Sequence, residues 1–70
     1  MTNNQIELKV QELTNTHYSY SQLEDYLINS ADDIGENNKN IYLSDGWKEI
    51  AINFKYTLTD EYDIIIHSIA

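Results

Sequence analysis

The chain has 70 residues, and a single domain of this size seldom holds more than about 3–5 kcal/mol of net stability. The core of so small a domain is barely large enough to keep it folded. A substrate pocket cut into that core, and hence an enzyme, is therefore not expected. Twelve Asp and Glu face four Lys, giving a net charge of −8. That balance disfavours direct binding to nucleic acid or anionic membrane, because such partners are held by Lys and Arg. A basic protein is the expected partner.

Cysteine is absent, so the chain has neither a disulfide nor a thiolate metal site. For so small a domain this favours a reducing compartment, and we expect the cytoplasm of a bacterial host cell. The first ten residues show no basic region followed by an apolar run, and no stretch approaches the roughly 20 apolar residues of a membrane span. We expect one domain over 1–70, with 1–5 frayed.

The segment 6–13 fits two structures. Ile6, Leu8 and Val10 alternate as in a strand, whereas Ile6, Val10 and Leu13 match one helical face. Propensity favours a helix, but Leu8 would then lie off the apolar stripe. We favour a strand here and keep a first helix as the alternative.

A helix is predicted over 20–34. Ser19 and Gln22 form a capping box at its start, and Gly35 stands where a left-handed C-cap is expected. The apolar side of this helix is predicted to carry Leu23, Tyr26, Leu27, Ala31 and Ile34.

Beyond an Asn-rich loop at 36–40, the period changes to that of strands. We predict an antiparallel meander of three strands at 40–44, 47–58 and 62–69, covered on one face by the helix, and therefore an α+β fold. The inner face is predicted to carry Ile41, Leu43, Ile50, Ile52, Phe54, Tyr56 and Leu58.

The dipeptide Asp45-Gly46 is a two-residue hairpin signal. A turn centred on it would place Leu43 opposite Lys48, and Ile41 opposite Ile50.

The last strand has isoleucines of both parities, so one face of this edge is expected to leave apolar side chains outward. With Tyr42 and Trp47 these isoleucines would make a contact patch, or the interface of a homodimer.

No pattern in the sequence points to catalysis or to a metal. His17 and His67 lie in different segments without a ligand partner at zinc spacing. The acids from Asp32 to Glu36 lack the spacing of a calcium loop. We therefore predict no catalytic residue, no metal and no cofactor.

The acids themselves are the remaining signal. On a helix reaching residue 34, Asp25 and Asp32 lie two turns apart, and Glu36 extends the row past the end, where carboxylates oppose the helix dipole. Fixed, separated negative charges of this kind can imitate a phosphate backbone. The predicted partner-binding residues are Glu24, Asp25, Asp32, Asp33, Glu36, Asp45, Trp47, Asp60, Glu61, Tyr62 and Asp63.

In size, in its lack of Arg and Cys, and in acids such as Asp32, Asp33 and Asp60, the chain resembles small acidic inhibitors that phages encode, anti-CRISPR proteins among them. The resemblance implies an inhibitor that occupies the groove of a basic nucleic-acid-binding protein, such as a CRISPR effector, and assigns no residue. The alternative is a non-inhibitory interaction module, such as an antitoxin, an immunity protein or a small assembly subunit, that uses its Ile-rich edge.

Overall fold

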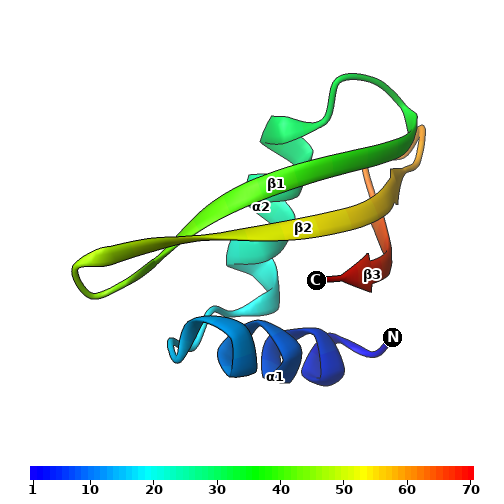
Figure 1. The fold of residues 1–70 in the computed structure, drawn as a ribbon. Helices are drawn as coiled ribbons and strands as arrows, with labels where there is room; N and C mark the ends of the chain where they lie inside the picture. The colour runs from blue at the N-terminus through cyan, green and yellow to red at the C-terminus, as the bar shows by residue number, and fades with distance from the viewer.

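A computed structural model describes residues 1–70 as two helices followed by a three-stranded antiparallel sheet. The strands lie in the order β1-β2-β3, and the two helices cover one face of the sheet (Figure 1). The predicted α+β meander is confirmed. Neither helix is long and apolar enough to cross a membrane.

Helix α1 spans Asn3–Thr14, so the strand favoured for this segment is wrong and the helical alternative is correct. Its start, expected to be frayed, is fixed by a capping box between Thr2 and Gln5. Ile6 and Val10 are buried one helical turn apart, whereas Leu8 is half exposed. A helical period places Ile6 and Val10 on one buried face and leaves Leu8 exposed to solvent.

Helix α2 spans Tyr20–Ser30 and begins at the predicted capping box of Ser19 and Gln22. It ends four residues before the predicted boundary, because Ala31 is already extended. Leu23 and Leu27 are buried, whereas Tyr26 and Ile34, which we placed on the apolar side, are exposed by about half.

The two helices are joined at α2's first turn. A carboxylate oxygen of Glu7 accepts the backbone N–H of Tyr20 at 2.7 Å, and its other oxygen contacts the His17 ring at 3.3 Å. These bonds, the first above all, lower the pKa of the Glu7 carboxyl. Glu7 thus satisfies a free donor at the start of α2 and stabilises the connection between α1 and α2.

Strands β1, Gly35–Asp45, and β2, Lys48–Leu58, pair along their full length. The stretch 36–40 is therefore strand and not the loop we expected. Cross-strand bonds explain the difference: the side-chain amide of Asn53 donates to Asn38 at 2.6 Å and to Asn40 at 2.9 Å. These contacts, with pairing along the whole ladder, outweigh the low strand propensity of Asn.

The turn between β1 and β2 is centred on Gly46 and Trp47, one residue later than predicted, because Asp45 pairs with Lys48. Leu43 accordingly lies opposite Ile50, and Ile41 opposite Ile52. The register moves by two residues, which keeps every side chain on its predicted face.

Strand β3, Ile64–Ile69, contains a bulge at His67, opposite the step from Lys55 to Tyr56. The bulge inserts one extra residue, so Ile64, Ile66 and Ile69 all reach the core although their parities differ. Only Ile65 of this group points outward, 52% exposed. The expected row of outward isoleucines does not form.

The buried hydrophobic side chains make one cluster between the sheet and the helices. Its 13 members are Ile6, Val10, Leu23, Leu27, Ile41, Leu43, Ile52, Phe54, Tyr56, Leu58, Ile64, Ile66 and Ile69. Ile50, predicted inside, packs against this cluster while partly exposed.

Candidate functional site

Two acidic loops leave the sheet at the same end. Gly35 of β1 pairs with Leu58 of β2, and Leu58 pairs with Ile64 of β3, so the segments 31–34 and 59–63 are neighbours (Figure 1). A shallow pocket of about 270 Å³ joins them, lined by Ile28, Ala31, Asp32, Asp33, Ile34, Leu58 and Tyr62. The fold therefore gathers acids that are some 30 positions apart in the sequence.

Asn37 fixes the first of these loops. Its side-chain oxygen accepts the N–H of Asp32 at 3.1 Å, and its amide nitrogen donates to the carbonyls of Asp33 and Gly35. The ammonium of Lys39 donates to the carboxylate of Asp32 at 2.5 Å and forms an ion pair with it. Asp32 and Asp33 thus lie on an ordered loop and not on the helical row that we predicted with Asp25.

The second loop is held by its own backbone. Thr59 N–H donates to the carbonyl of Asp63, and Tyr62 N–H donates to the carbonyl of Thr59, both at 2.9 Å. The hydroxyl of Thr59 accepts the N–H of Asp63 at 3.0 Å. Asp60 and Glu61 stand at the exposed apex of this loop. Tyr62 has a φ of 64°, a conformation that a non-glycine residue adopts at a cost.

Helix α2 adds a further carboxylate beside the second loop. The pKa of Tyr20 is raised, first by burial and then by the negative charges of Glu24 and Asp63. Both carboxylates therefore lie near this phenol, whose hydroxyl donates to the carbonyl of Ile64 at 3.4 Å. Glu24 of α2 and Asp63 of the second loop belong to one region of negative potential.

We call the carboxylates of this region the acidic end. Its members are Glu24, Asp32, Asp33, Asp60, Glu61 and Asp63. All six were predicted as binding residues. Tyr62, the predicted anchor here, is 62% exposed beside them.

The remaining predicted residues lie elsewhere. Asp45 and Trp47 are at the hairpin tip, and the 11 residues of β1, at about 3.3 Å each, place this tip roughly 33 Å from the acidic end. Trp47 is fully exposed there. Asp25 is exposed on α2, and Glu36 lies on the open face of the sheet.

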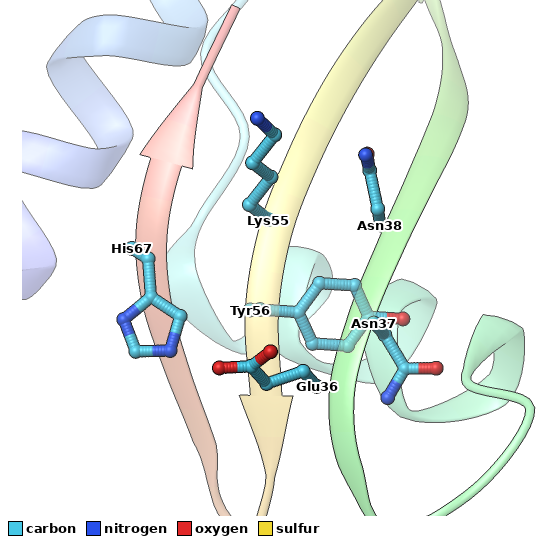
Figure 2. Close-up of a pocket in the computed structure, with 6 residues that line it drawn as sticks. All are labelled: Glu36, Asn37, Asn38, Lys55, Tyr56 and His67. Carbon is cyan, nitrogen blue, oxygen red and sulfur yellow. The ribbon is translucent and has the colours of Figure 1, made fainter.

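The open face of the sheet was predicted only in part, through the single residue Glu36. It holds a shallow depression of about 510 Å³, with Asn38, Lys55 and His67 contributed by three adjacent strands (Figure 2). Its wall also includes Glu36, and the His67 ring bonds the hydroxyl of Thr57 at 2.7 Å. The outward positions of β1 and β2 could have been collected from the alternation, but the bulge that adds His67 could not.

No group of three or more His, Asp and Glu side chains is placed to hold a metal ion. The carboxylates of the acidic end are spread over two loops and a helix instead of converging on one point. An arrangement of this kind spreads negative charge over an area of the protein surface.

Comparison with known proteins finds no match to a family model, to a curated protein or to a solved structure.

Proposed function

We propose that this protein inhibits a basic nucleic-acid-binding protein, such as a CRISPR effector, by placing its acidic end in the groove that normally holds the phosphate backbone. The observation that carries the proposal is uncompensated charge. Of twelve carboxylates, two have an ion-pair partner in the fold, Glu7 with His17 and Asp32 with Lys39, which leaves ten without one. A surface with this charge favours encounter with Lys- and Arg-rich grooves.

Rigidity supports the same function. A carboxylate held on an ordered loop loses little freedom on binding, so more of its attraction to a cation is retained as affinity. Asn37 and Thr59 order the two loops from within. The exposed ring of Tyr62, between the acids, adds the apolar contact that aromatic residues supply at interfaces.

The alternative function, an interaction module docked through an Ile-rich edge, has weaker support in the fold. The bulge in β3 turns three of the four isoleucines inward and exposes Ile65 alone. One exposed isoleucine is ordinary for a protein surface.

The test is displacement of a fluorescent oligonucleotide from purified nucleic-acid-binding proteins with basic grooves, CRISPR effectors among them. The wild type should displace the oligonucleotide, and its affinity should fall steeply as salt rises. The triple variant Asp60→Asn, Glu61→Gln, Asp63→Asn should keep its fold, because none of these side chains bonds within the protein. It should bind at least tenfold more weakly at low salt, since one close charge pair can contribute about 1.5–7 kcal/mol.

The matched control is the triple variant Glu12→Gln, Asp25→Asn, Glu49→Gln. It changes net charge equally, from −8 to −5, at exposed positions outside the acidic end. It should lose much less affinity than the loop variant. Equal losses would show that total charge matters and placement does not, and unchanged affinity in both would contradict the proposal.

A further inference from the structure

We infer that the free edge of β1 is a second binding surface, which takes up an extended segment of the partner as a fourth strand of the sheet. The inference rests on the proposed function for one property only, the partner's positive charge. The geometry of the edge is independent of it. Figure 1 shows β1 at the border of the sheet, with β2 on its other side.

Two sets of bonds establish which backbone groups of β1 face outward. Asn53 of β2 exchanges both of its backbone hydrogen bonds with Ala70, so it faces β3 and cannot bond to Asn40, its neighbour in β1. The N–H and C=O of Asn40 therefore point away from the sheet. The N–H and C=O of Ser44 also point away from the sheet, because both bond the hydroxyl of Tyr18 at 2.8 Å.

The two-residue period of a strand extends this result to Asn38 and Tyr42. Neither residue, nor Asn40, has a backbone partner on the outer side. Three N–H groups and three C=O groups thus form a template for another strand. The hydroxyl of Tyr18 closes the template at Ser44, so the available edge runs from Asn38 to Tyr42.

The side chains along this edge leave it open. Asn38 and Asn40 turn across the sheet toward Asn53. Lys39, a residue type that often protects sheet edges, turns to the helix side and is tied to Asp32. β1 has no proline and no bulge, the other common protections.

The opposite edge of the sheet is protected. β3 has six residues, is interrupted by the bulge at His67, and has the carbonyl of Ile64 bonded by Tyr20. Bulges and short length are features by which natural sheets avoid edge pairing. β1 has neither feature, with 11 regular residues where a mean strand has about 5–6.

Charge decides what kind of segment fits this edge. A second copy of the chain would bring another net charge of −8 against the first, which opposes self-pairing. Carboxylates stand at both ends of the edge, Asp33 and Glu36 at one and Asp45 at the other. An extended segment carrying Lys or Arg meets attraction at both ends of this edge, so we assign the edge to a basic strand of the partner protein.

A synthetic ten-residue peptide of alternating Lys and Val is the probe. In the free protein the amides of Asn38, Asn40 and Tyr42 should exchange rapidly with solvent, and the peptide should slow their exchange at least tenfold. The control peptide has the same sequence with an N-methyl group on every residue, which keeps the side-chain charge and removes the backbone donors from both edges. It should give no protection at these three amides.

The matched variants are Asn40→Pro and Asn40→Ala. Proline removes the outward N–H. This group makes no hydrogen bond in the β1–β2 ladder, so the fold should survive. Binding of the peptide should weaken roughly tenfold or more. Alanine loses the side-chain bond to Asn53 equally but keeps the N–H, and it should bind as the wild type does. If the proline variant fails to fold, the two peptides on the wild type still decide.

The outcomes separate the two proposals. Protection of the edge amides together with weak binding by the proline variant supports the edge. Peptide binding that is lost in the Asp60, Glu61 and Asp63 variant but unchanged in Asn40→Pro overturns the edge and leaves the acidic end standing. The edge amides could instead be protected already in the free protein, with sedimentation showing a dimer. That result would assign the edge to a second copy of the chain and overturn the basic strand.

Discussion

The two hairpins of this sheet share β2 and are specified in different ways. The β1–β2 hairpin has a two-residue turn and an unbroken ladder, and its register follows from turn geometry. The β2–β3 hairpin has a longer loop, a left-handed Tyr62 and a bulge, and its register follows from burial of Ile64, Ile66 and Ile69. One strand can therefore be positioned by local chemistry on one side and by core packing on the other.

The largest expected effect is on both hairpins together. Phe54 lies on the shared strand, between Lys39 and Ile69, and is completely buried. Phe54→Ala should lower the free energy of unfolding by about 3–5 kcal/mol, most of what a domain of this size has. Urea unfolding followed by circular dichroism measures it. The control Tyr42→Ala, on the exposed face, should cost under about 1 kcal/mol. Comparable losses in the two variants would mean that Phe54 is not central to the core.

The next effect should be confined to the first hairpin. Gly46 has a φ of 62°, and a β-branched residue is strained there. Gly46→Val should cost about 1–3 kcal/mol. D-alanine at the same position, introduced by chemical synthesis, matches the positive φ and should keep the wild-type stability. If thermal unfolding shows equal stability for the two variants, turn geometry does not specify this hairpin.

The smallest effect should improve the second hairpin. Tyr62 has a φ of 64°, and Asn tolerates this region better than Tyr. Tyr62→Asn should raise the free energy of unfolding by up to about 1 kcal/mol. Tyr42→Asn, the same replacement at a regular strand position, should give no gain. A loss of stability in Tyr62→Asn would show that the contacts of this ring outweigh its backbone strain.

The sequence was sufficient for features that depend on neighbouring residues. The capping box of Ser19 and Gln22, the alternation along β2 and the existence of the first hairpin were all predicted. The turn itself was misplaced by one residue, because Gly46 can serve either position of a two-residue turn. The strand favoured at 6–13 was wrong because Leu8 was assumed to need burial.

Features that depend on distant pairing were not predictable in this way. Helix α2 was extended to residue 34 because Ile34 continued its stripe and Gly35 imitated a C-cap, whereas Gly35 in fact pairs with Leu58 in the sheet. The same pairing brings the segments 31–34 and 59–63 together. The acids were thus identified one by one from the sequence, while their assembly into one surface depended on a register that no local pattern sets.

The position of Trp47 determines what its fluorescence can report. It is the single tryptophan of the chain, and it is fully exposed at the hairpin tip. Its emission in the folded protein should resemble that of the unfolded chain, because its indole is surrounded by water in both states. Tryptophan fluorescence is therefore nearly silent to folding of this protein, whereas a blue shift on mixing with a second macromolecule would report directly that the tip has been covered.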